Sequence, residues 1–366
     1  MKTQYINPFN PQFGYLPRKI IGRSRIISDY VSGLNYKSNV NRTTILTGLR
    51  GSGKTALLSD IAKTLEKKKY IIAEVTAHDG MLEEILNEIM IKGQKYLKKH
   101  LGSVSSFTVG ALGFSFGFTR TRDDRKMGFR HMLTEILNHL ERNNITLVIS
   151  VDEIHNDSIE MRELVIAYQH LIREGRDVSL LMAGLPNAVF DVLNDKVLTF
   201  LRRAHRVVLE NLDTDVVKSS FENEFVALGI KINPEQLDYI AKASFGYPYL
   251  YQLIGFHIVD QNTDKITSKK AELAISVSRR ELFRNIHDLV WNELSHKDKE
   301  FIQSMAKNTG EVRTADIASD LGVSQSYIST YRARLIDSGI IYQSSYGYVS
   351  FALPFMKEYI EEKETL

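Results

Sequence analysis

A glycine-rich segment early in the chain has the residue types that bind nucleotide phosphates. The string Gly48-Leu49-Arg50-Gly51-Ser52-Gly53-Lys54-Thr55 is a complete Walker A sequence. A β-branched run precedes it and a helical pattern begins at Lys54, which is the strand, loop and helix order that the motif requires. Glycines let backbone N–H groups turn inward around phosphates, and the positive end of the following helix points at them.

Each polar residue of this loop has an expected role. Lys54 should reach the β- and γ-phosphates, and Thr55 should ligate Mg²⁺. The cofactors implied are therefore ATP or ADP together with Mg²⁺. The residues expected to bind the nucleotide are Gly48, Arg50, Gly51, Ser52, Gly53, Lys54, Thr55 and Ala56.

A second apolar strand ends in two adjacent acids, the pattern of a Walker B motif. Leu147–Val151 is followed by Asp152 and Glu153. Asp152 is expected to hold Mg²⁺ through water, and Glu153 to orient and deprotonate the attacking water, so Lys54 and Glu153 are predicted catalytic residues. The alternative role of the two acids is to cap the next helix. His155 completes an Asp-Glu-Ile-His string found in some helicases, but no other helicase motif accompanies it.

Strand and helix patterns alternate through about residue 210. Apolar strands are expected at residues 44–47, 70–75, 145–151, 178–183 and 205–209, with helices between them. Such strands predict a parallel sheet covered on both faces. The pattern is purely helical after Leu212 and changes again near Leu294. We expect a nucleotide-binding core with an N-terminal linker at 1–212, a helical domain at 213–294 and a third domain at 295–366.

The third domain contains helix-turn-helix spacing. Residues 314–323 give a short helix and a glycine stop, and Ser324 opens a longer helix through Ile336. Residues 340–343 and 348–351 predict a hairpin wing. Acidic and basic residues nearly cancel in this domain, so one copy should bind duplex DNA weakly. The residues expected to contact DNA are Ser324, Gln325, Ser326, Ser329, Thr330, Arg332 and Tyr346.

Composition limits the function. The 366 residues include 47 Lys and Arg against 44 Asp and Glu, a net charge of +3, so the whole chain lacks the charge of a strongly nucleic-acid-binding protein. The absence of cysteine excludes disulfides, thiolate nucleophiles and cysteine-ligated metals. Residues 1–13 are polar and show no secretory signal, so a cytoplasmic location is expected.

One uncharged stretch, Leu101–Thr119, is about as long as a membrane span. Its phenylalanines alternate with small polar residues, which favours a β-hairpin-like insertion over lipid contact, and no membrane association is expected. The basic residues beside it form either a second nucleic-acid patch or a solvated charge run. They are Arg120, Arg122, Arg125, Lys126 and Arg130.

These features together resemble the AAA+ ATPases, and among them the bacterial and archaeal relatives of the origin-recognition and licensing ATPases. The resemblance covers almost the whole chain and implies an α/β fold class: a P-loop NTPase parallel sheet (the AAA+ core), a helical lid domain and a C-terminal winged helix-turn-helix domain. It rests on the two Walker motifs, the terminal winged helix and the strings Pro17-Arg18-Lys19-Ile20-Ile21-Gly22-Arg23, Ala183-Gly184-Leu185-Pro186 and Gly246-Tyr247-Pro248.

The resemblance also implies roles for residues outside the Walker motifs. Ile20, Ile21 and Arg23 would pack against the adenine. Arg202 and Arg203, just before the last strand, match the arginine finger that completes a neighbouring subunit's site. The expected assembly is therefore a homo-oligomer with the finger acting in trans.

Two departures from the family pattern affect the expected activity. The fourth strand ends in Ala183-Gly184-Leu185-Pro186 where the family has a polar sensor, and Asn187 is the nearest candidate. Gly246-Tyr247-Pro248 stands where a second sensor arginine is common, as in the STAND signalling ATPases, which implies that Pro248 lies near the phosphates. Hydrolysis is therefore expected to be slow, with the nucleotide acting as a switch.

The sequence predicts an ATP-binding and hydrolysing AAA+ switch protein that binds double-stranded DNA through its winged helix in a nucleotide-dependent, oligomeric manner. One alternative is a STAND-like signalling or defence ATPase whose winged helix binds a protein partner. Another is a target-selecting ATPase for mobile DNA. The salt dependence of DNA binding separates the first two, because a contact dominated by phosphates weakens steeply with salt.

Overall fold

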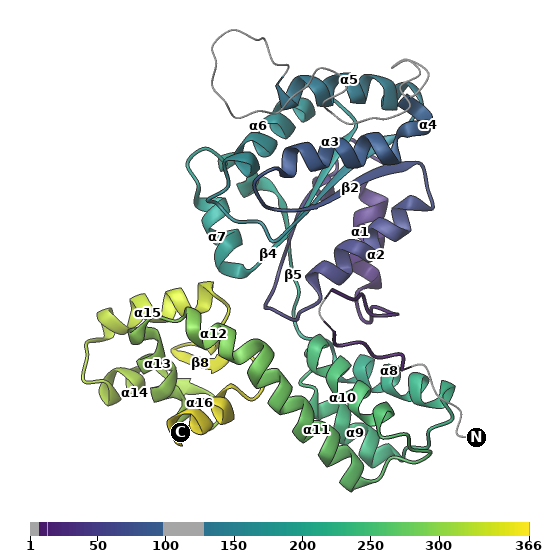
Figure 1. Ribbon diagram of the computed structural model, residues 1–366. Coiled ribbons are helices and arrows are strands. Elements are labelled where there is room, and N and C mark those ends of the chain that lie inside the picture. The colour runs from purple at the N-terminus through teal and green to yellow at the C-terminus, as the bar shows by residue number, and fades with distance from the viewer. Residues whose placement is uncertain (1–6, 13, 98–127, 366) are drawn as a thin grey trace. The chain divides into compact units, whose positions relative to one another are not determined.

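The computed structural model of the protein describes residues 7–12, 14–97 and 128–365 (Figure 1). The chain divides into two compact units. The sheet unit consists of Arg23–Thr47 and Lys54–Val208, and the helical unit of Met1–Gly22, Gly48–Gly53 and Leu209–Leu366.

The sheet unit is built on five parallel strands in the order β2-β3-β4-β1-β5. The strands are β1 (Thr43–Thr47), β2 (Tyr70–Thr76), β3 (Thr146–Asp152), β4 (Val178–Gly184) and β5 (His205–Val208). Thr47 pairs with Gly184 and Thr76 pairs with Asp152, so the carboxyl ends of neighbouring strands lie at one edge of the sheet. The predicted parallel sheet is confirmed.

Helices cover the two faces of this sheet. The helices α1 (Ser24–Gly33) and α2 (Lys54–Glu66) pack together on one face, and α3 (Met81–Lys92), α5 (Phe129–Arg142) and α6 (Ile159–Arg173) cover the other (Figure 1). All β3 residues before Asp152 are buried, which explains the continuous apolar run in the sequence. The shorter helical elements are η1 (Val40–Arg42), α4 (Gln94–Leu97), α7 (Pro186–Asn194) and η3 (Thr199–Arg203).

The helical unit begins with a set of packed helices. They are α8 (Thr214–Ala227), α9 (Pro234–Ala243), α10 (Pro248–Asp260), α11 (Ser268–Leu282), the π-helical segment η4 (Phe283–His287) and α12 (Asp288–Glu293). The N-terminal segment belongs to this packing, because the Phe9 ring lies 5.4–5.9 Å from the rings of Phe221, Phe225 and Tyr251.

The C-terminal segment of the same unit has the predicted order of three helices, a hairpin and a final helix. Its elements are α13 (His296–Ala306), β6 (Val312–Arg313), α14 (Thr314–Asp320), α15 (Gln325–Asp337), β7 (Ile341–Ser345), β8 (Tyr348–Phe351) and α16 (Met356–Thr365). The short strand β6 joins the hairpin in an antiparallel sheet of order β6-β8-β7. One buried apolar cluster runs from Phe9 to Ile360, so the division at 212 and 294 stays a prediction.

No described helix is both long and apolar enough to span a bilayer. The predicted insertion at Leu101–Thr119 lies outside the described residues, as do Arg120, Arg122, Arg125 and Lys126.

Candidate nucleotide-binding site

The segment Gly48–Gly53, here called the phosphate loop, has the backbone conformation of an anion-binding nest. Gly51 and Gly53 have φ angles of +73° and +89°. Left-handed residues placed between right-handed ones turn successive N–H groups to one side of the chain. The Ser52 N–H also donates to the Leu49 carbonyl at 3.2 Å, which closes a turn inside the loop.

Two further observations are consistent with a phosphate-binding role for this loop. The Ser52 hydroxyl oxygen is buried and has no hydrogen-bond partner among the described residues, and a buried unpaired hydroxyl is costly unless a ligand or water satisfies it. A Cβ on Gly48 would lie 2.6 Å from that oxygen, whereas a Cβ on Gly53 would meet nothing within 4 Å. The loop is therefore closely packed at Gly48 and open at Gly53.

The predicted magnesium residues lie in contact in the sheet unit. The Thr55 hydroxyl, in the first turn of α2, donates to Asp152 Oδ2 at 2.6 Å. The Glu153 N–H donates to the other carboxylate oxygen, Oδ1, at 2.8 Å. Asp152 is thus held from both sides at the end of β3. A threonine hydroxyl beside a carboxylate is a donor set that suits Mg²⁺.

Glu153 has a strained backbone. Its φ angle is +53°, which is uncommon for a residue with a Cβ and is often retained at functional sites. The side chain is exposed, beside the Asp152 carboxylate. The adjoining backbone is fixed, because Ala77 N–H donates to the Asp152 carbonyl and Ile154 N–H donates to the Ala183 carbonyl, each at 2.9 Å. This arrangement holds a carboxylate next to the candidate metal ligands.

The other polar residues near the strand ends have simpler surroundings. His155 is half-buried, with Nε2 at 3.4 Å from the Ala77 carbonyl. Asn187, the candidate sensor, is exposed in the first turn of α7. Ala56 is half-buried in the first turn of α2, and Lys54 is the first residue of that helix.

The Gly-Tyr-Pro turn contacts the phosphate loop within the helical unit. The Tyr247 hydroxyl donates to the Arg50 carbonyl, and the Tyr249 N–H donates to the Gly51 carbonyl at 3.2 Å. Pro248, the residue that the sequence predicted near the phosphates, is the first residue of α10 between these two contacts. Sequence reasoning missed Tyr247 and Tyr249. The one available signal was their position on either side of the motif's proline.

The Arg50 side chain has a protein partner. Its guanidinium pairs with the Glu293 carboxylate at the end of α12, with 2.6 Å between nitrogen and oxygen. The predicted contribution of Arg50 to nucleotide binding is therefore left to its backbone in this conformation.

The residues predicted to contact adenine precede α1. Ile20 and Ile21 are half-buried, and Ile21 packs against the apolar cluster of the helical unit. Gly22 has a φ angle of +68°, and a Cβ there would lie 2.8 Å from the Leu212 side chain. Arg23 is the N-cap residue of α1. Their adenine contact stays a prediction.

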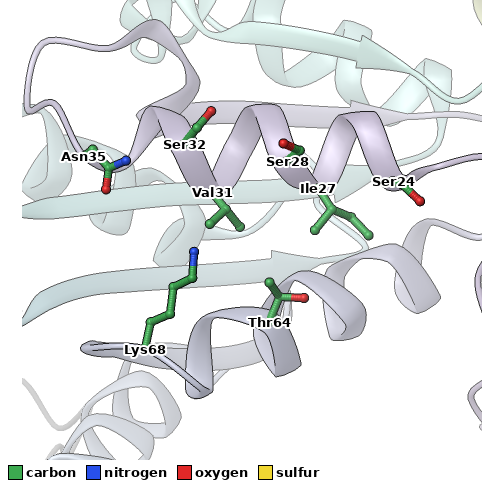
Figure 2. A pocket seen from close by; sticks show the side chains of 8 residues that line it. All are labelled: Ser24, Ile27, Ser28, Val31, Ser32, Asn35, Thr64 and Lys68. Carbon is green, nitrogen blue, oxygen red and sulfur yellow. The ribbon is translucent and has the colours of Figure 1, made fainter.

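A groove lies between α1 and α2 in the sheet unit (Figure 2). It has a volume of about 460 Å³, and the Lys68 side chain extends toward α1 across it (Figure 2). Its lining residues are Ser24, Ile27, Ser28, Val31, Ser32, Asn35, Thr64 and Lys68. None of them belongs to a Walker motif, so this groove is not the phosphate site.

The predicted finger arginines lie in η3, directly before β5. Both Arg202 and Arg203 are exposed. Arg202 Nε donates to the Leu193 carbonyl at 3.0 Å, which fixes the base of that side chain. Arg130, from the predicted basic patch, is paired with Glu174.

The predicted DNA-contacting residues occupy one helix and one turn of the C-terminal segment. Ser324, Gln325, Ser326, Ser329 and Thr330 are exposed along α15, while Ile328 and Leu335 are buried. Tyr346 is 97% exposed in the turn between β7 and β8. Arg332 differs, because it is half-buried and donates to the Gln343 side chain at 2.5 Å.

Two family models match separate parts of the chain. The model of an AAA domain matches residues 39–193, and a model of a domain of unknown function, DUF8462, matches residues 284–360. No curated protein sequence matches the chain.

Two solved archaeal structures are similar over nearly the full length of both chains. The Walker-type ATPase PABY2304 of Pyrococcus abyssi has a TM-score of 0.66 at 15% identity, covering 96% of this chain and 99% of its own. The ORC2 protein of Aeropyrum pernix, solved as ADPNP-ADP complexes, has a TM-score of 0.61 at 13% identity, covering 97% and 98%. At such identities the likeness concerns the fold. Residues 39–193 therefore form an AAA domain, and the chain has the fold of an AAA+ P-loop ATPase that resembles the origin-recognition-like proteins.

Proposed function

We propose that the protein binds and slowly hydrolyses ATP with Mg²⁺, and that the bound nucleotide controls how the helical lid and the C-terminal winged helix present a surface to double-stranded DNA. The observation that carries the proposal is the 2.6 Å contact between the Thr55 hydroxyl and Asp152 at the end of β3. It brings the Walker A and Walker B residues together. The ADPNP-ADP complexes of the ORC2 protein support the choice of nucleotide.

Each residue of the site has one task in this mechanism. The N–H groups of the phosphate loop and the Lys54 ammonium bind the phosphate oxygens, and they act by position and charge because phosphoryl transfer needs little covalent chemistry from the protein. Thr55 and Asp152 would hold Mg²⁺, which supplies positive charge to the β- and γ-phosphates when bound. Glu153, beside Asp152, accepts the proton of the attacking water.

The surface that responds to the nucleotide would be the exposed face of α15 and the turn at Tyr346. A small exposed polar helix next to a hairpin suits a major groove and the adjoining backbone. Arg202 and Arg203 are exposed before β5, in keeping with a finger that acts in trans within a homo-oligomer. Such an assembly would add the phosphate contacts that one nearly neutral C-terminal domain lacks.

Substitutions at Lys54 and Glu153 test the nucleotide chemistry. Lys54→Ala should lose most ATP affinity, because its ammonium is the main γ-phosphate contact. Glu153→Gln should keep ATP affinity within about twofold while the hydrolysis rate falls by roughly 10²–10⁴, the usual contribution of a general base. Fluorescent-ATP titration and phosphate release measure both. A Lys54→Ala protein that binds and hydrolyses ATP like the parent would contradict the proposal.

A STAND-like signalling switch is the second candidate. The contacts of the Gly-Tyr-Pro turn with the phosphate loop favour it, because they connect the start of α10 directly to the loop that would hold the phosphates. In that case the C-terminal domain binds a protein, and duplex DNA has no effect on nucleotide binding or hydrolysis.

A further inference from the structure

The backbone carbonyls of the phosphate loop are in contact with another segment of the helical unit. Two consecutive carbonyls, those of Arg50 and Gly51, accept hydrogen bonds from the turn that begins α10. The donors are the Tyr247 hydroxyl and the Tyr249 N–H. The loop and the turn both belong to the helical unit.

Holding a carbonyl also fixes the N–H of the next residue. The two groups share one peptide plane and point in opposite directions when the peptide is trans, and the described chain has no cis peptide bond. The bond from Tyr247 to the Arg50 carbonyl therefore turns the Gly51 N–H toward the inside of the loop. The bond from Tyr249 does the same for the Ser52 N–H, which closes the turn onto Leu49.

Tyr247 is closely fitted to its position. The residue is fully buried, and burial raises the pKa of its hydroxyl well above the usual value, so the group remains a donor at any working pH. A Cβ on Gly51 would lie 2.5 Å from the Tyr247 hydroxyl oxygen and 2.9 Å from the Tyr249 Cβ. The loop and the aromatic ring therefore have no space between them for another group.

The turn before Tyr247 is held by hydrogen bonds on both sides of Gly246. Phe245 and Gly246 both have left-handed backbones, with φ angles of +52° and +66°. The Gly246 carbonyl accepts from the Leu212 N–H at 2.7 Å, and the Gly246 N–H donates to the Ser244 hydroxyl at 3.1 Å. A strained backbone persists only where its surroundings determine it, so this turn is built to place the next residue.

We propose that Tyr247 is a positioning residue for ATP: its hydroxyl holds the Arg50–Gly51 peptide in the orientation that directs the Gly51 N–H at the phosphates. This inference rests on the proposed function and assigns a role to the middle residue of the Gly-Tyr-Pro turn. Tyr249 supports the neighbouring peptide through its backbone. The exposed Arg50–Glu293 ion pair lies on the solvent side of the same loop and adds little, as exposed pairs do.

Tyr247→Phe tests the role, with Tyr251→Phe as the matched control. Tyr251, in the first turn of α10, is also buried, and its hydroxyl pairs with Ser220 at 2.8 Å. Both variants lose one buried hydroxyl from the helical unit, so both should lose a similar amount of thermal stability. Only Tyr247→Phe should weaken ATP binding, by about 3- to 10-fold, the equivalent of one hydrogen bond.

The ATP titrations distinguish failure of the proposed function from failure of the positioning role of Tyr247. The parent and Lys54→Ala proteins are titrated in the same series with fluorescent ATP. If the parent does not bind, the proposed function and this inference are both overturned. If the parent binds and Tyr247→Phe binds equally well, or if Tyr251→Phe is weakened to the same degree, only the positioning role is overturned.

A second measurement leaves the tyrosine in place, in case Tyr247→Phe does not fold. 3-Fluorotyrosine at position 247 reports on the hydroxyl environment through its fluorine resonance. Addition of ADP and Mg²⁺ should shift that resonance, and the same label at position 251 should remain unchanged. An unchanged resonance at 247 under saturating ADP would overturn the proposal.

Discussion

The chemistry of the site depends on how single residues divide their hydrogen bonds. Asp152 uses one carboxylate oxygen for the Thr55 hydroxyl and the other for the Glu153 N–H. The same carboxylate therefore orients a candidate metal ligand, Thr55, and fixes the backbone of the candidate base, Glu153. Glu153 directly follows β3 and has a left-handed backbone. The direction of its side chain is therefore set by this local turn and not by a helix or strand.

Gly246 is the residue at which a single methyl group should matter most. A Cβ there would lie 2.0 Å from the Leu212 carbonyl oxygen, and the φ angle of +66° is unfavourable for alanine. Overpacking and a left-handed backbone together cost roughly 2–5 kcal/mol. Gly246→Ala should therefore unfold at a clearly lower temperature, or at a lower urea concentration, than the parent protein.

Gly229→Ala is the control for that substitution. Its φ angle is +69°, and a Cβ would meet nothing within 4 Å. It should lose only about 1–2 kcal/mol from the backbone conformation. Equal losses for the two alanine variants in urea denaturation would contradict the close approach at Gly246.

Among the elements, the π-helical segment η4 joins α11 to α12. His287, its last residue, is fully buried. Its Nε2 lies 2.9 Å from the Pro354 carbonyl and its Nδ1 lies 3.2 Å from the Leu282 carbonyl. The Phe283 and Tyr359 rings pack beside the imidazole.

This histidine should make stability depend on pH. Burial lowers its pKa from 6.5 to about 4, so between these values the unfolded chain binds a proton that the folded chain does not. Stability contributed by the neutral ring is therefore lost as pH falls from about 6.5 to 4, by on the order of 3 kcal/mol in all.

Urea denaturation at pH 7 and pH 5 measures this dependence. His287→Gln keeps an amide donor for Pro354 and should reduce the pH dependence. His296→Gln, at a ring that is 85% exposed, should leave it unchanged. The same loss of stability at pH 5 in the parent and in His287→Gln would show that another group is responsible.

The elements could be predicted from the sequence to a greater degree than their tertiary contacts. Apolar runs located the buried strands β3 and β4, because both faces of the sheet are covered there, and the residue types of the Walker motifs located Thr55 and Asp152. Glu160 shows the limit. This buried carboxylate on α6 accepts from the Gly80 and Leu82 N–H groups at the start of α3, about 80 residues away in the chain.

Tyr247 and Glu293 show the same limit within the site. Their partners are a backbone carbonyl and a side chain of the phosphate loop, roughly 200 or more residues earlier. A tyrosine directly before an apolar helix and an acid at a helix end have no local pattern that distinguishes them from ordinary core and surface residues. Only the packing of α10 and α12 in the helical unit reveals these contacts.

For the whole molecule, charge should decide how DNA is bound. The exposed face of α15 is uncharged at Ser324, Gln325, Ser326, Ser329 and Thr330. With about two phosphate contacts per chain, raising the salt from 50 to 200 mM should weaken duplex binding only about tenfold. Tyr346→Ala should lower the affinity without changing this salt slope, because tyrosine has no charge. A roughly thousandfold loss of duplex affinity in the parent between 50 and 200 mM salt would show that a further basic surface dominates DNA binding.

The most direct test of the central claim is the rate of ATP hydrolysis with and without duplex DNA, in the parent and in Glu153→Gln. We predict that duplex DNA stimulates hydrolysis by the parent and that Glu153→Gln remains inactive in both conditions, because this substitution removes the proposed base. An unchanged rate in the parent on addition of DNA would contradict a DNA-controlled switch and favour a protein partner for the C-terminal domain.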